Sequence, residues 1–223
     1  MRSPTLTLPT SLRTTADARA LSQLRQYFGR DDPRDAFYGA MFDEWDTTGT
    51  RQTDADRLTP DDFLSLACLS EGFPPRALHT VLVDDAAQFN ALLAQIPSDV
   101  DMADLEEPWT SDHPAWRLHS ALLQLPKVGR TRASKLLARK RPRLVPIYDS
   151  FVAVEMGIGG HHWEPLRIML RTTGLHERLR SLKSEAGVPE TVSPLRVLDV
   201  IAWKDRWDVV KGVGHADSGR WSR

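Results

Sequence analysis

The stretch LQLPKVGRTRASKLLARKRPRLVPIYD, residues 123–149, decides the fold class of this chain. An apolar segment ends at a proline and is followed by a short turn with one glycine. A second helical segment, rich in Lys and Arg, comes next, and a single carboxylate closes the stretch. Two helices joined by so short a turn lie against each other as a helical hairpin. The sequence therefore predicts a helix-hairpin-helix over residues 121–141.

The residue types of this hairpin have physical reasons. Pro126 ends the first helix, Gly129 opens the turn, and Ala133 lets the second helix approach the first closely. The first N–H groups of the second helix have no partner inside the helix, and with the positive end of the helix dipole they suit a phosphate group. Lys127 stands where glycine is usual, and a positive φ there costs roughly 1 kcal/mol or somewhat more.

Positive charge is concentrated around this hairpin. Residues 113–148 contain nine Lys or Arg and no Asp or Glu, whereas residues 31–107 contain 18 acids and four bases. The formal net charge of −1 does not exclude a polyanionic partner, because local charge decides such contacts. DNA is the expected partner, and the residues expected to contact it are Lys127, Val128, Gly129, Arg130, Thr131, Arg132, Lys135, Arg139 and Lys140.

The alternative for the second helix is a solvated basic face that binds nothing. In that case Arg139, Lys140 and Arg141 only complement the negative end of the helix dipole. The acidic residues 31–107 are by default a solvated exterior. The alternatives are a surface for a basic protein partner, or a surface that repels DNA and so orients the basic face towards it.

Helical spacing continues along the rest of the chain, and alternating strand patterns are hard to find. Most segments are bounded by Pro, Gly or a Ser, Thr or Asp cap. The segments with this pattern are residues 17–28, 59–69, 75–83, 85–96, 114–125, 131–141, 146–156, 163–171, 175–187 and 193–207. The sequence therefore predicts an all-α helical bundle.

The predicted domain organisation is simple. Residues 1–15 are expected to form a flexible tail, residues 16–207 one helical domain that could divide into two lobes, and residues 208–223 a loose tail. Residues 36–45 fit either a short helix or an irregular segment.

Composition excludes several classes of protein. The chain has 223 residues, of which 41% are apolar and 26% are charged, which is ordinary for a globular protein. Cys68 is the only cysteine, so an internal disulfide and a Cys-ligated zinc or iron–sulfur site are excluded. No signal peptide and no apolar span approaching ~20 residues occurs, so the expected location is cytoplasmic. His161 and His162 have no further ligand at suitable spacing, and they fit a surface turn; no metal or cofactor is expected.

Two longer patterns carry a resemblance to known families. LPKVGRTRASKLLA followed by VPIYDSFV resembles the signature of the helix-hairpin-helix DNA glycosylases, the endonuclease III and adenine glycosylase group. In that family an aspartate follows the hairpin, and Asp149 stands at the matching place, 18 residues after Thr131. LLARKRPRLVPIYDSFV together with SPLRVLDVIAW also resembles an uncharacterised family common in high-GC actinobacteria, over most of residues 20–207.

The glycosylase resemblance implies a hydrolase of base excision repair, with Asp149 as the catalytic acid. Tyr148, next to Asp149, is a separate candidate for an aromatic residue that lines the substrate pocket, and a place in the core is the alternative. Thr131 replaces the Schiff-base lysine of bifunctional members, so only monofunctional N-glycosylase chemistry is implied. Two features depart from the family: no four-cysteine cluster follows, and the residues that flank the aspartate differ. Pro146 predicts a helix start that places Asp149 in a first turn, where it could instead only stabilise its own helix.

Three functional hypotheses follow. The first is a DNA-binding protein that is a monofunctional N-glycosylase, and the second is a non-catalytic helix-hairpin-helix DNA-binding module. The third is a helical protein-interaction domain that uses the acidic half. The tryptophans expected in the core are Trp116, Trp163 and Trp203, and those that are candidates to stack on bases are Trp109, Trp207 and Trp221.

Overall fold

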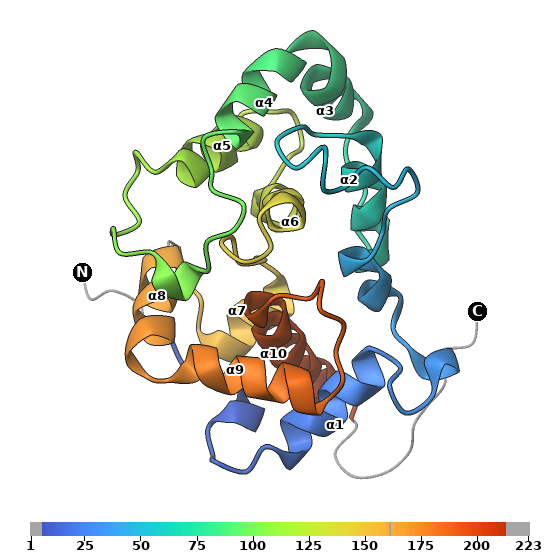
Figure 1. Cartoon of the computed structure of the whole chain (residues 1–223), viewed down its shortest axis with the longest axis vertical. Helices are drawn as coiled ribbons and strands as arrows, with labels where there is room; N and C mark the ends of the chain where they lie inside the picture. The colour runs from blue at the N-terminus through green and yellow to red at the C-terminus, as the bar shows by residue number, and fades with distance from the viewer. Residues whose placement is uncertain (1–5, 161, 213–223) are drawn as a thin grey trace.

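The computed structural model describes residues 6–160 and 162–212, and all regular structure within these ranges is helical (Figure 1). The predicted all-α class is therefore confirmed. The α-helices are α1 (Ala18–Tyr27), α2 (Pro60–Leu64), α3 (Pro75–His79), α4 (Ala86–Leu93), α5 (Pro114–Leu123), α6 (Arg130–Lys140), α7 (Ser150–Met156), α8 (Trp163–Thr172), α9 (Leu175–Glu185) and α10 (Pro194–Val210). Between them lie the 3-10 turns η1 (Thr10–Leu12), η2 (Pro33–Asp35), η3 (Tyr38–Asp43), η4 (Ser65–Leu69) and η6 (Met102–Asp104) and the π-helical turn η5 (Thr80–Asp84).

Proline and capping residues set several helix starts where the sequence predicts them. Pro60, Pro114 and Pro194 occupy the first turns of α2, α5 and α10, where a backbone N–H is not needed. In front of α2, Thr59 and Asp62 form a capping box. These starts are therefore properties of the local sequence.

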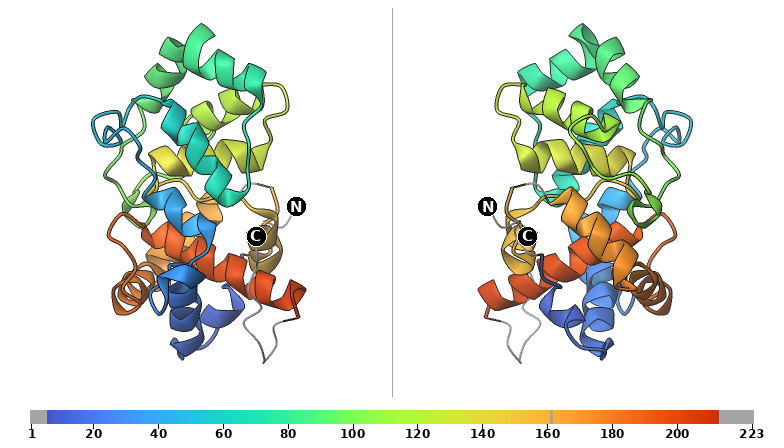
Figure 2. Two further views of the ribbon diagram at one scale, coloured as in Figure 1. Left: turned by 90° about the vertical axis from the view of Figure 1, so that its right-hand side faces the viewer. Right: turned by 90° about the vertical axis from the view of Figure 1, so that its left-hand side faces the viewer.

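Helix α6 runs through the middle of the molecule. Helices α2 to α5 form the upper lobe in Figure 1, α1 and α7 to α10 form the lower lobe, and the side views of Figure 2 agree in placing α6 between them. Helix α6 contacts α2 and α5, while α10 packs along α7, α1 and α9. Ala133, Leu136 and Leu137 of α6 are at most 1% exposed. The hairpin helix is thus part of the core.

The N-terminal segment is bound to the lower lobe. Thr7 N donates to Met156 O at 3.0 Å, and Ser11 donates from its backbone N and its Oγ to the carboxylate of Asp205 at 2.7 and 2.6 Å. Asp205 is 1% exposed, and a buried carboxylate needs such donors. The expectation of a flexible tail therefore fails for residues 6–12. Residues 13–15 are exposed and not helical, and residues 1–5 lie outside the described residues. The predicted loose tail of residues 208–223 is wrong for residues 208–210, which belong to α10, and from residue 213 onward it lies outside the described residues.

The ambiguous residues 36–45 contain η3. A Cβ at Gly39 would lie 2.0 Å from the hydroxyl oxygen of Tyr27, so glycine is required where η3 meets α1. Among the helices of residues 6–160 and 162–212, none is long and apolar enough to cross a membrane.

Candidate nucleic-acid interface

The turn between α5 and α6 has the conformation that the sequence predicts. The chain turns after Leu123, and α6 begins at Arg130. Lys127 has a φ of 60°, which is the left-handed region that favours glycine, so the predicted strain is present. Gly129 is extended, with φ −100° and ψ 177°, and no atom lies within 4 Å of where its Cβ would stand. The turn is open at Gly129.

The N-terminus of α6 has free hydrogen-bond donors within the described part of the chain. The N–H groups from Gly129 to Arg132 have no acceptor there, and no side chain caps the helix. The first bonded N–H is that of Ala133, which donates to Gly129 O at 3.0 Å. Gly129 is exposed and Thr131 is half-buried. Donors and the positive dipole end therefore meet at an accessible turn, which is the geometry that binds anions.

Arg132 holds this turn in place. Its Nε donates to Gly72 O at 2.7 Å and lies 3.2 Å from the Oε2 of Glu71, and its NH1 donates to Lys127 O at 2.9 Å. Because its guanidinium has these partners, Arg132 acts as a brace between the hairpin and the upper lobe.

The remaining cations of the hairpin are Lys127 and Arg130. Lys127 is exposed, and its ammonium has no ion-pair partner among the described residues. Arg130 is half-buried, and its guanidinium lies over the ring of Tyr148, 4.0 Å from the ring centroid. Val128 is 6% exposed and packs into the core, so only its backbone is part of the turn.

The later cations of α6 are buried. The side chains of Lys135, Arg139 and Lys140 are 5%, 1% and 3% exposed. Burial lowers the pKa of Arg139 to about 10 and lowers the pKa of Lys140. The oxygen atoms that they contact are Leu69 O (3.1 Å from Lys135 Nζ), Phe42 O (2.7 Å from Arg139 NH1), Trp45 O (also Arg139), Asp54 O (2.9 Å from Lys140 Nζ) and the carboxylate of Asp62 (3.0 Å from Lys140 Nζ).

The expectation of phosphate contacts at Lys135, Arg139 and Lys140 is therefore corrected. Their charged ends already satisfy buried protein oxygen atoms, and removing them would leave those atoms unpaired. The alternative of a solvated basic helix does not hold either. The basic run of α6 is mostly a set of internal donors.

Arg141, directly after α6, is the extreme case, with an exposed fraction of 0%. It joins segments that lie far apart in the sequence. Its acceptors are Ile96 O at 2.7 Å, Leu93 O at 2.8 Å, Ala55 O at 2.8 Å and the carboxylate of Asp56 at 2.5 Å.

Asp149 is the N-cap of α7. Its Oδ1 accepts from Phe151 N at 2.9 Å, and its Oδ2 lies 3.5 Å from Lys135 Nζ. Helix α7 begins at Ser150 and not at Pro146 as predicted, because Asp149 is itself extended, with φ −130° and ψ 148°. The side chain of Asp149 is 21% exposed. The helix-stabilising role that the sequence allowed is thus present, and the carboxylate also has a cationic neighbour.

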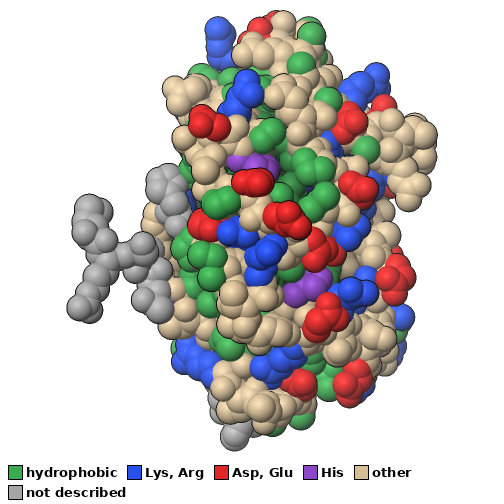
Figure 3. All heavy atoms as spheres, turned by 60° about the vertical axis from the view of Figure 1, so that its left-hand side comes forward, with side chains coloured by type: hydrophobic (Ala, Val, Ile, Leu, Met, Phe, Trp, Pro, Cys, Tyr) green, Lys and Arg blue, Asp and Glu red, His purple; other side chains and the backbone are tan. Residues whose placement is uncertain are grey.

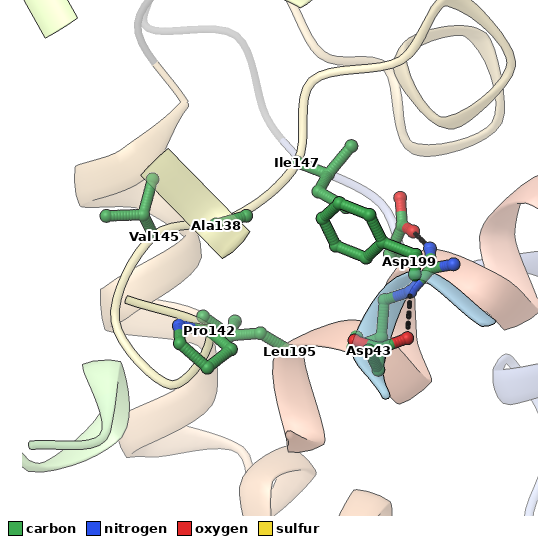
Figure 4. A pocket seen from close by; sticks show the side chains of 9 residues that line it. Asp43, Ala138, Pro142, Val145, Ile147, Leu195 and Asp199 are labelled. Atoms are coloured by element: carbon green, nitrogen blue, oxygen red, sulfur yellow. Dashed lines mark hydrogen bonds and ion pairs between the residues drawn. The ribbon is translucent and has the colours of Figure 1, made fainter. Parts of the chain in front are cut away.

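A buried polar network is centred on Arg196 of α10, and Figure 4 shows two of its carboxylates, Asp43 of η3 and Asp199 of α10, at one small cavity. Arg196 connects them, since its Nε donates to Asp43 Oδ2 at 3.1 Å and its NH1 to Asp199. Its NH2 donates to the Tyr27 hydroxyl at 2.7 Å. The cavity has a volume of about 10 Å³, which is room for a single water molecule. A nucleobase does not fit there.

This network is coupled to Asp149. Burial raises the pKa of Asp199 to about 6, Arg196 opposes the rise, and the charge of Asp149 adds to it. Sequence reasoning missed Arg196 and Asp199. The available signal was a pair of opposite charges three residues apart on the apolar stripe of α10.

The tryptophans gather in two aromatic clusters. Trp163 is 4% exposed and confirms the core prediction; its ring centroid lies 4.7 Å from that of Trp116 and 4.9 Å from that of Trp109. Trp203 and Trp207 stack with centroids 4.8 Å apart. Trp109 and Trp207, two of the candidates for base stacking, are therefore packed on other rings. The third, Trp221, lies outside the described residues.

The expectation of a surface turn at His161 and His162 is tested only for His162. His162 is 3% exposed, so the expected surface turn does not apply to it, and His161 lies outside the described residues. Within residues 6–160 and 162–212 no group of three His, Cys, Asp or Glu could hold a metal ion. Acidic and basic side chains are interspersed on the face shown in Figure 3, so that face carries no field of one sign.

Comparison with known proteins identifies a family. No curated protein and no solved structure matches the chain. A family model matches residues 20–206, which is most of the sequence. The chain therefore belongs to DUF6308, a family of unknown function.

Proposed function

We propose that the protein binds the sugar–phosphate backbone of DNA, without reading base sequence, through the hairpin turn of residues 124–130. The observation that carries this proposal is the row of free N–H groups from Gly129 to Arg132 at an open turn. Backbone donors at a helix N-terminus recognise phosphate and carry no base information.

The charge available at this turn sets the strength of the contact. Lys127 and Arg130 are the cations that a phosphate can approach, since Arg132 is braced and the later cations are buried. Neutralising about two phosphates gives a slope of log affinity against log salt of roughly −2. We therefore expect weak binding of duplex DNA that falls with salt and does not depend on sequence.

Gly129→Asp is the sharpest test. An Asp fits the extended backbone and the open space at this N-cap position. Its carboxylate would accept hydrogen bonds from the free N–H groups in place of a phosphate. We expect the variant to be as stable as the wild type or more stable, with duplex affinity reduced at least tenfold in fluorescence anisotropy.

Arg180→Gln, on α9, is the matched control because its side chain is 62% exposed and outside the hairpin. Its affinity should equal that of the wild type. Unchanged affinity in Gly129→Asp, or wild-type binding that is insensitive to salt, would contradict the proposal.

A second candidate function is monofunctional N-glycosylase chemistry at Asp149. It is favoured by the position of this partly exposed carboxylate at the start of α7, directly after Tyr148, whose ring contacts Arg130 of the hairpin. Because the nearby cavity holds one water molecule, a base has to open the site before it can enter.

Duplexes with a panel of damaged bases, followed by alkali treatment, test this chemistry. Strand cleavage by the wild type and not by Asp149→Asn supports it. Binding without cleavage on every substrate leaves the non-catalytic DNA-binding module.

A further inference from the structure

Arg130 has intramolecular partners that compete with a phosphate. Its guanidinium lies over Tyr148 at 4.0 Å, donates through NH2 to Gly160 O, and has Gly159 O at 3.5 Å from the same nitrogen. All three partners lie later in the chain, on the connections that flank α7. The hairpin and the surroundings of α7 are therefore joined by one side chain.

The partners lie at the two ends of α7. Tyr148 directly precedes Asp149, the N-cap of the helix, and Gly159 and Gly160 belong to the connection from α7 to α8. Gly157 ends α7 in the left-handed conformation, with φ 66°. The chain turns there, and the carbonyl groups of Gly159 and Gly160 then face the guanidinium of Arg130. The contact thus fixes the connection of residues 157–160 to the first turn of α6.

A guanidinium binds rings with its face and oxygen atoms with its edge. Arg130 NH2, the edge nitrogen that donates to Gly160 O, can also donate to a phosphate oxygen. The carbonyl group of Gly160 and a phosphate therefore compete for this donor. A hydrogen bond with an ionised acceptor is roughly twice as strong as one with a neutral acceptor. A phosphate at the turn is therefore the preferred partner once DNA is present.

We propose that the contact of Arg130 with Tyr148 and Gly160 is autoinhibitory: it withholds a cation from DNA, and DNA binding releases residues 157–160 at the C-terminal end of α7. This inference rests on the proposed function of the hairpin. It adds that the free protein holds the hairpin in a state of lower affinity, and that backbone binding changes the segment after α7.

Tyr148→Leu is the first test, because it removes the ring face and keeps Arg130. We expect duplex affinity to rise roughly two- to fivefold, the equivalent of one exposed cation–π contact. Arg130→Gln should bind more weakly than the wild type, and the double variant should match Arg130→Gln. Equal or weaker binding by Tyr148→Leu would overturn the inference, since Tyr148 then does not restrain Arg130 against DNA.

Hydrogen exchange at the amides of residues 157–160 is the second test. We expect exchange to speed up when duplex is added to the wild type, and to be fast in Arg130→Gln with or without duplex. Binding with unchanged exchange overturns this inference and leaves the proposed function standing. Absence of duplex binding by the wild type overturns both.

Discussion

The carboxylate of Asp62 lies 3.0 Å from the ammonium nitrogen of Lys140, and each side chain is 3% exposed. Lys140 is the last residue of α6 and Asp62 lies in the first turn of α2, so this ion pair joins the central helix to the upper lobe. Removal of one partner from a buried pair leaves an uncompensated charge, which is one of the larger costs that a single substitution can cause.

Lys140→Met should therefore be strongly destabilising. We expect the free energy of unfolding to fall by about 3 kcal/mol, the lower end of the cost of a broken buried pair, because Asp62 loses its ammonium partner and keeps the Arg139 guanidinium 3.6 Å away. Urea unfolding measures the change. Arg180→Met on the exposed face of α9 is the control and should stay within about 0.5 kcal/mol of the wild type. A loss at Lys140 as small as that of the control would show that the pair is not buried in solution.

Lys127→Gly should stabilise the protein. Lys127 has a φ of 60°, and glycine relieves the strain of that conformation, so the free energy of unfolding should rise by about 1 kcal/mol. Lys127→Ala removes the same charge and keeps the strain, which makes it the matched control. Equal stability of the two variants would contradict the left-handed turn.

Replacements of Asp149 should distinguish the contribution of its N-cap hydrogen bond to stability from the contribution of its negative charge. Asn keeps an N-cap oxygen for Phe151 N, whereas Ala removes it, and both leave Lys135 without this carboxylate. We therefore expect Asp149→Ala to be less stable than Asp149→Asn by about 1 kcal/mol in urea unfolding. If the two variants have the same free energy of unfolding, the hydrogen bond to Phe151 N contributes nothing to the stability of α7.

Asp199 should make stability depend on pH. Because burial raises its pKa from 3.8 to about 6, the native state holds this proton more tightly than the unfolded state does. The stabilising contribution is fully present below about pH 4 and is lost as the pH rises through about 6. Unfolding free energies of wild type and Asp199→Asn between pH 4 and 8 should therefore diverge, with the wild type losing stability relative to the variant. Parallel curves would contradict the shift.

The hairpin could be predicted from the sequence because its determinants are local. Pro126, Gly129 and Ala133 act on the chain within a few residues of themselves, and even the positive φ of Lys127 follows from the motif. The same holds for the cap and proline signals that start α2, α5 and α10.

The environment of the basic run could not be predicted in this way. Whether Arg139 or Lys140 meets solvent or protein depends on the carbonyl groups of residues 42–54, which approach α6 only in the folded chain. The same limit hid Asp199, whose pairing with Arg196 is local while its burial against Asp43 is not. Charge counting therefore overestimated how many cations of α6 are exposed.

The internal position of Arg141 has a consequence for synthesis of the protein. Carbonyl groups of Ala55, Leu93 and Ile96 leave the ribosome well before the arginine that they accept hydrogen bonds from. Domains generally fold as units, with the N-terminal part first during translation. Here the carbonyl groups of the upper lobe gain these donors only after residue 141 has been synthesised, so we expect this lobe to complete its folding late in translation.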